Sequence, residues 1–97
     1  MIARELMSMI LSFLYGEYDA GDFSFDFPAK LSFNYTALLT ENKHLCDLLE
    51  EDVPDICASF DPYNLADKGT FGEREFRDKI LAIYLKALPI AISELVS

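Results

Sequence analysis

The chain has 97 residues, 52% of them hydrophobic, which is enough for one globular domain that folds without a metal or disulfide staple. Seventeen acidic residues against eight basic ones give a formal net charge of −9 at pH 7. This charge repels nucleic-acid phosphates and anionic lipids, whereas it attracts basic proteins and speeds their encounter. We therefore expect no direct nucleic-acid binding, no membrane binding, and a basic protein as the partner.

The first predicted element is a helix over residues 2–15, with Gly16 as its C-terminal stop. Its core stripe consists of Ile2, Leu6, Met9, Ile10 and Phe13. The apolar run is short, is interrupted by serines and lacks the several bases that start a signal peptide. No apolar stretch of the sequence reaches the ~20 residues that span a bilayer. We expect a cytoplasmic protein.

The next segment, residues 19–41, has a mixed pattern. Phe23, Phe25 and Phe27 alternate with polar residues as in a strand, whereas the leucines that follow are spaced as in a helix. Because a lone strand would have no partner, we expect a short helical turn over residues 20–27 and a helix over residues 28–39, with Pro28 in its first turn. The three phenylalanines are interpreted as core, and a protein-binding patch is the alternative.

Residues 41–63 combine the clearest helical stripe with the densest charge. The apolar side consists of Leu45, Leu48, Leu49, Val53, Ile56 and Phe60. The opposite side carries Asp47, Glu50, Glu51 and Asp55, with Asp52 at its border. No Lys or Arg occurs between His44 and Asp67, which predicts an acidic face without counterions on a helix that is kinked or broken at Pro54.

Like charges three or four residues apart on a helix repel by a few tenths of a kcal/mol per pair, so this acidic stripe costs stability without helping the chain to fold. The stripe therefore indicates a partner outside the fold. An ordinary solvated face of an acidic protein is the alternative interpretation.

The last predicted element is a helix that starts at residue 71 or 72, after a polar loop over residues 64–69. Thr70 and Glu73 have the spacing of a capping box, and Pro89 should kink or end the helix before a final turn or frayed tail over residues 90–97. Together these elements predict an all-α, antiparallel four-helix bundle, as a single domain over residues 1–97 with its core over residues 2–88.

The sequence offers little catalytic or cofactor chemistry. The lone histidine, His44, is interpreted as a surface or capping residue, and Cys46 and Cys57, about 16 Å apart along one helix, as buried thiols. The loop around Gly69 lacks the oxygen ligands of an EF-hand, and the Asp-Ser-Leu attachment motif of acyl carrier proteins is absent. We expect no enzyme activity, no catalytic residues, no metal and no cofactor.

Three segments resemble a known family, the colicin D immunity proteins and the related immunity proteins of contact-dependent growth-inhibition systems. The segments are LSFLYGEYDAGDF, LCDLLEEDVPDI running into FDPY, and GEREFRDKI, within a likeness that extends roughly over residues 5–88. The resemblance implies an antiparallel four-helix bundle that binds and neutralises the C-terminal nuclease domain of a cognate toxin, often a nuclease that attacks transfer RNA. In such proteins, acidic surface groups can stand in for the phosphates of the nuclease's substrate.

The toxin-binding surface that the resemblance implies consists of Asp47, Glu50, Glu51, Asp52, Asp55, Asp61 and Tyr63. For Asp61 the alternative role is a cap on the turn, and for Tyr63 it is a core side chain with a hydrated hydroxyl. An acidic helical adaptor, or a nucleic-acid mimic that regulates another basic protein, is the alternative function. A small enzyme or carrier is the third possibility considered.

Overall fold

The computed structural model describes residues 1–61 and 70–96, with side chains through residue 92, and the described residues form an all-α fold. Among the described residues, an isolated parallel β-bridge joins Phe60 and Phe71 between the last two helices. The described helices are α1 (Ile2–Leu14), α2 (Ala20–Phe33), α3 (Tyr35–Glu41), α4 (Lys43–Ala58) and α5 (Glu73–Val96).

Local hydrogen bonds explain where α1 ends. After α1, Gly16 has a φ of 84°, its N–H donates to the Phe13 carbonyl at 3.1 Å, and the Glu17 N–H donates to the Ser12 carbonyl at 2.9 Å. This is a Schellman motif, which needs the left-handed conformation that glycine adopts without strain. The predicted stop at Gly16 is therefore confirmed.

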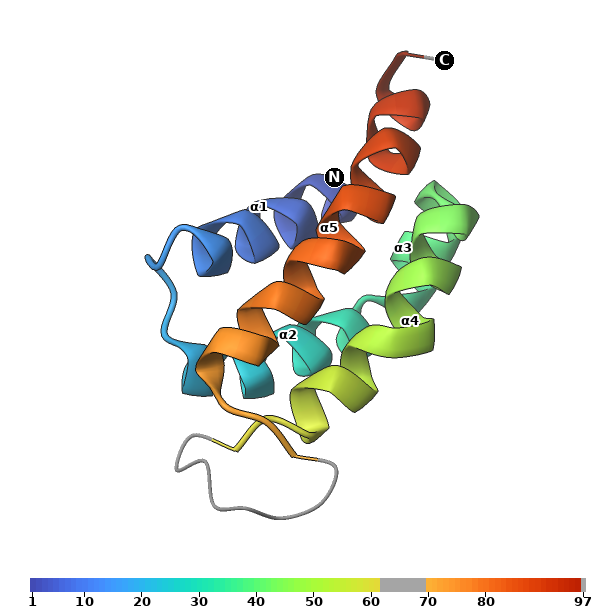
Figure 1. Ribbon diagram of the computed structural model, residues 1–97. Helices are drawn as coiled ribbons and strands as arrows, with labels where there is room; N and C mark the ends of the chain where they lie inside the picture. The colour runs from blue at the N-terminus through green and yellow to red at the C-terminus, as the bar shows by residue number, and fades with distance from the viewer. Residues whose placement is uncertain (62–69, 97) are drawn as a thin grey trace.

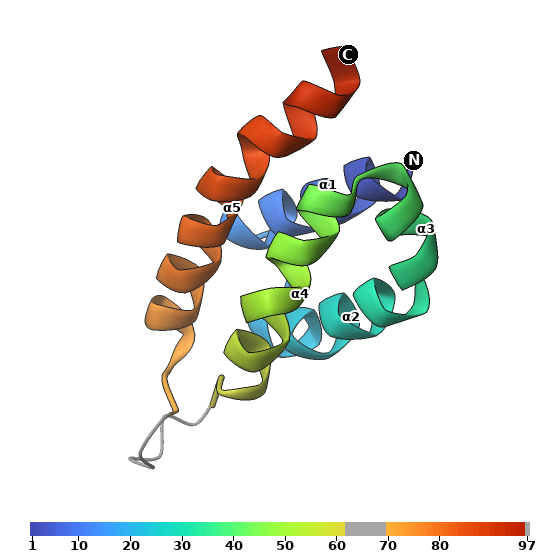
Figure 2. The same cartoon turned by 90° about the vertical axis from the view of Figure 1, so that its right-hand side faces the viewer.

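The helices pack around α4 and α1. Helix α4 contacts α5, α3 and α2, and α1 contacts α5, α2 and α3. In Figure 1, α1 passes behind α5, while α4 and α5 run in opposite directions. Figure 2 shows α2 beside the lower half of α4 and the C-terminal end of α5 extending beyond the other helices.

An aromatic cluster forms one end of the core. The ring of Phe23 stacks on Phe13 with centroids 4.3 Å apart and lies 5.1 Å from Phe27, and Phe76 lies 4.9 Å from Phe13. All four side chains are fully buried. Arg77 covers the Phe13 ring, with its guanidinium carbon 4.7 Å from the centroid, and donates a hydrogen bond to the Phe13 carbonyl. The cluster therefore joins α1, α2 and α5.

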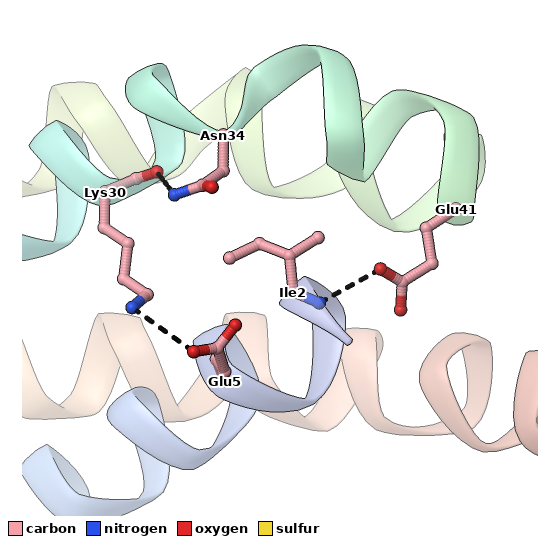
Figure 3. Close-up of polar contacts among 5 residues, drawn as sticks. All are labelled: Ile2, Glu5, Lys30, Asn34 and Glu41. Carbon is pink, nitrogen blue, oxygen red and sulfur yellow. Dashed lines mark hydrogen bonds and ion pairs between the residues drawn. The ribbon is translucent and has the colours of Figure 1, made fainter.

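Polar contacts fix α1 against α2 and α3, as Figure 3 shows. The Ile2 N–H donates to Glu41 Oε2 at 3.0 Å, and Lys30 Nζ lies 3.8 Å from Glu5 Oε1. Asn34 Nδ2 donates to the Lys30 carbonyl at 2.9 Å, which caps the end of α2. The first bond connects the start of α1 to the end of α3, and the ion pair connects α1 to α2.

The all-α class is confirmed, but the described residues form five helices instead of four. The boundary expected near Pro28 is wrong, because α2 continues through this proline to Phe33 and the chain changes direction at Asn34. Phe23, Phe27 and Leu31 share one buried side of α2. Burial of three large side chains from both halves of the helix offsets the hydrogen bond that Pro28 cannot make.

Pro54 and Pro89 likewise lie inside helices. α4 continues without a break through Pro54 to Ala58, and α5 continues through Pro89 to Val96. The expected frayed tail over residues 90–97 is therefore wrong through residue 96. Ile90 and Ala91 pack against the core beyond the proline, and Asn42 Nδ2 donates to the Ile90 carbonyl at 3.4 Å. In the described part of the chain, no helix is both long and apolar enough to cross a membrane.

Candidate functional site

The outer side of α4 carries five of the predicted contact residues. The inner side is buried and consists of Leu45, Cys46, Leu49, Val53 and Cys57. This packing turns the carboxylates toward solvent, so that Asp47, Glu51, Asp52 and Asp55 are exposed and Glu50 is half-buried. We call these five residues the acidic face of α4. Their positions on a regular helix hold the charges in a fixed spacing.

One expectation about the acidic face needs correction. Asp47 has a counterion, because Lys43, one turn earlier on α4, places its Nζ 2.7 Å from Asp47 Oδ2. This hydrogen bond and the charge of Asp47 raise the pKa of Lys43. The lysine was missed because it lies just before the base-free stretch. Within residues 1–61 and 70–92, no lysine or arginine forms an ion pair with Glu50, Glu51, Asp52 or Asp55.

The remaining two predicted contact residues follow α4. Asp61 is half-buried, and its backbone N–H donates to the Phe71 carbonyl at 2.9 Å, beside the bridge to the start of α5. This bond fixes the backbone of Asp61 next to the C-terminal end of α4. Tyr63 lies outside the described residues.

The two cysteines are on the inner side of α4. Both thiols are buried and free, as expected. Burial raises the pKa of Cys57 to about 12 and also raises the pKa of Cys46, where the nearby carboxylates of Glu50 and Asp47 add to the effect. The thiols therefore stay protonated and serve as packing groups. Among the described residues, no three His, Cys, Asp or Glu side chains lie close enough to hold a metal ion.

A second exposed surface was missed at the level of sequence, on the outer side of α2. Phe25 is 79% exposed and Phe33 is 90% exposed, with the exposed Ala29 between them. We call Phe25, Ala29 and Phe33 the aromatic face of α2. The core interpretation is correct for Phe23 and Phe27 and wrong for Phe25. The i, i+4, i+8 spacing from residue 25 was the available signal, but the boundary expected at Pro28 divided it between two elements.

Carboxylates border the aromatic face. Asp22 and Asp26 are both exposed on the same helix. The Tyr18 hydroxyl donates to Asp26 Oδ2 at 2.6 Å, and this bond is the main reason why the pKa of Tyr18 is raised to about 12. The side chain of Asp26 is thereby held at the edge of the aromatic face.

A mostly apolar pocket of about 320 Å³ lies away from both surfaces. It is lined by α1, by α5 and by the junction of α3 and α4, and its polar groups include Arg4 and Glu41. Glu41 accepts the Ile2 N–H through Oε2, whereas its buried Oε1 has no hydrogen-bond partner among the described residues. None of the residues of the acidic face or of the aromatic face lines this pocket.

Comparisons of this chain with protein-family models, with curated proteins and with solved structures find no match. The two exposed helix faces and the sequence resemblance are therefore the features that bear on function.

Proposed function

We propose that this chain is an immunity protein that binds the basic nuclease domain of a cognate bacterial toxin and neutralises it through an acidic surface. The observation that carries the proposal is the acidic face of α4, where four of five carboxylates have no ion-pair partner among the described bases. The resemblance to colicin D and contact-dependent growth-inhibition immunity proteins supplies the partner class, a domain that cleaves transfer RNA.

A nuclease groove is lined by Lys and Arg that would otherwise bind phosphates. Carboxylates on a rigid helix need no ordering of the backbone on binding, and charge-assisted hydrogen bonds to Arg and Lys are among the strongest in proteins. Because Glu51 and Asp55 are one turn apart on the outer side of α4, they can contact neighbouring bases at once. In this proposal Asp61 and Tyr63 extend the contact surface beyond the end of α4.

The proposal also fits the arrangement of helices. If α2 and α3 are counted as one helix bent at Asn34, the count becomes the four that the resemblance implies. The protein is proposed to act in the cytoplasm, which is where a tRNA-cleaving domain meets its substrate, and to need no cofactor or metal.

Co-expression tests this function directly. The protein is produced together with the C-terminal domain of the large protein encoded immediately upstream, and growth, tRNA integrity and co-purification are measured in the same cells. We expect the domain alone to stop growth, and the pair to restore growth and to yield a stable complex. Toxicity without relief and without a complex would refute the immunity function and would favour an acidic adaptor for another basic protein.

Charge reversal tests the surface. In the variant Glu50→Lys/Glu51→Lys, we expect affinity for the toxin domain to fall about 100-fold, with a slower association and a weaker dependence on salt. The matched control is Glu75→Lys/Asp78→Lys, which changes the net charge equally on exposed positions of α5 and should alter affinity less than about threefold. Equal affinity of both variants would remove the acidic face of α4 from the interface. Far-UV circular dichroism checks that both variants fold.

A further inference from the structure

The aromatic face of α2 points directly away from the core. At about 100° per residue, Phe25, Ala29 and Phe33 cover an arc of about 80° and extend about 12 Å along the helix. This arc lies opposite the buried stripe that contains Phe23 and Phe27. The exposed fractions of 79% for Phe25 and 90% for Phe33 show that the described part of the chain leaves both rings in water.

Folding gains nothing from these two rings. Phenylalanine has a lower helix propensity than the Ala, Leu, Glu or Lys that usually occupy outer helix positions, and it has no polar atom that water could solvate. Neighbouring exposed aromatic rings on a small protein are instead typical of interaction sites, because large rigid rings give much contact area at small entropic cost. This surface therefore has the character of an interaction site.

The charges around the aromatic face decide which partner fits. Asp22 lies one turn before Phe25, and Asp26 is the next residue after it, with its carboxylate held by Tyr18. Lys30, which precedes Phe33 on the same helix, pairs with Glu5 Oε1 at 3.8 Å. A second copy that packed its α2 in parallel against this face would bring Asp22 and Asp26 of the two copies toward one another, in a chain whose net charge is already −9. The complementary surface is an apolar pocket with Lys and Arg at its rim.

We propose that the aromatic face of α2 is a second contact surface for the same basic toxin domain, whose base-rimmed apolar pocket takes up Phe25 and Phe33. This inference rests on the proposed immunity function and goes beyond it, because it separates an apolar anchor from the acidic face. Helix α2 packs directly against α4, and Figure 2 shows the two helices side by side. A partner that buries about 800 Å² can therefore reach both helices.

The test compares Phe25→Ala, Phe33→Ala and the double variant with a matched control, Tyr15→Ala. Tyr15 is 74% exposed at the end of α1, so this control also removes an exposed ring but leaves α2 intact. The probe is the purified toxin domain encoded immediately upstream. We expect each single α2 variant to weaken binding about tenfold through faster dissociation, and the double variant about 100-fold. The control should change affinity less than about twofold.

Salt dependence distinguishes this surface from the acidic face. The α2 variants should keep the salt dependence of the unmodified protein, because they remove no charge. If the unmodified protein binds the toxin domain and the double variant binds equally well, the inference is overturned while the immunity function stands. If the unmodified protein does not bind at all, the immunity function itself fails. Sedimentation that shows a dimer dissociated by the double variant would instead assign the face to a second copy.

Discussion

Helices α2 and α4 are built alike and present different chemistry to solvent. Each contains an internal proline, and each begins with a side-chain oxygen that accepts a backbone N–H at 3.0 Å. The outer side of α4 is acidic, whereas the outer side of α2 presents Phe25 and Phe33. Carboxylates act at long range and steer association, whereas rings act only on contact and slow dissociation. An acidic face can therefore set the association rate, while an aromatic face sets the dissociation rate.

The two helices also differ in the side chains that they bury in the core. α4 contributes aliphatic side chains and two thiols to the inside of the fold, while α2 contributes Phe23 and Phe27 to the aromatic cluster. In α2, phenylalanines thus occupy both the buried and the exposed side. Residue type alone cannot distinguish the two sides of this helix, and substitutions can.

The largest expected effect comes from exchanging phenylalanine for alanine on the two sides of α2. Phe23→Ala removes a fully buried ring that contacts Phe13, Phe27 and Phe76, so we expect the free energy of unfolding to fall by ~3–5 kcal/mol. Phe25→Ala removes an exposed ring and should change it by less than ~0.5 kcal/mol. Urea denaturation followed by circular dichroism measures both values.

If Phe23→Ala proves too unstable to study, Phe23→Leu keeps an apolar side chain at this position. It should lose less than Phe23→Ala but still clearly more than Phe25→Ala. Equal stabilities of the two variants at positions 23 and 25 would contradict the assignment of inner and outer sides.

Removing the N-terminal caps of α4 and α2 is expected to produce a smaller difference in the free energy of unfolding. Asn42 is 2% exposed, its Oδ1 accepts the Leu45 N–H, and its Nδ2 donates to the Ile90 carbonyl. Asn42→Ala leaves a buried donor unpaired, so we expect a loss of ~2 kcal/mol in the free energy of unfolding. Asp19 makes the equivalent bond at α2 but is exposed, and water replaces the carboxylate in Asp19→Ala, so the loss there should be ~0.5–1 kcal/mol.

Thermal and urea unfolding of the two cap variants measure this contrast. Asn42→Ser and Asp19→Asn serve as controls, because each retains an oxygen that can accept the first-turn N–H. They should recover part of the loss at α4 and most of it at α2. A larger loss for Asp19→Ala than for Asn42→Ala would mean that burial does not set the strength of these caps.

The sequence predicted α4 well because its apolar and acidic residues alternate with the helical period and so fall on opposite sides of the helix. Apolar residues recur every three or four positions and acids fill the gaps, so the inner and outer sides follow from the period alone. The capping asparagine and the counterion of Asp47 were missed because both lie at the edge of the segment. Lys43 precedes the base-free run, and its pairing depends on a rotamer that the sequence does not specify.

The sequence predicted α2 poorly because phenylalanine occurs at alternate positions. Residues 23, 25 and 27 mimic a strand, and Pro28 suggests a boundary, although tertiary packing of Phe23 and Phe27 carries the helix through it. Burial of side chains before and after the proline also explains why α4 continues through Pro54 and α5 continues through Pro89. Propensity is a local quantity, and burial of a helix side is a property of the whole fold.

The smallest effect is expected from removing the hydrogen bond between Tyr18 and Asp26, which holds the Asp26 side chain at the edge of the aromatic face. Because the folded state raises the pKa of Tyr18 from 10.0 to about 12, it retains the phenolic proton over a pH range in which the unfolded chain releases it. The contribution of this bond is therefore fully present below pH 10 and is lost as the pH rises toward 12. In Tyr18→Phe, the free energy of unfolding should fall by less than ~1 kcal/mol at pH 7, since the bond is exposed, and the gap to the unmodified protein should close between pH 10 and 12.

Urea unfolding at pH 7, 9 and 11 measures the gap, and Tyr15→Phe, an exposed tyrosine away from α2, corrects for general alkaline effects. A gap that stays constant or widens with pH would mean that Asp26 does not hold the Tyr18 hydroxyl, and that the edge of the aromatic face is set by the helix backbone alone.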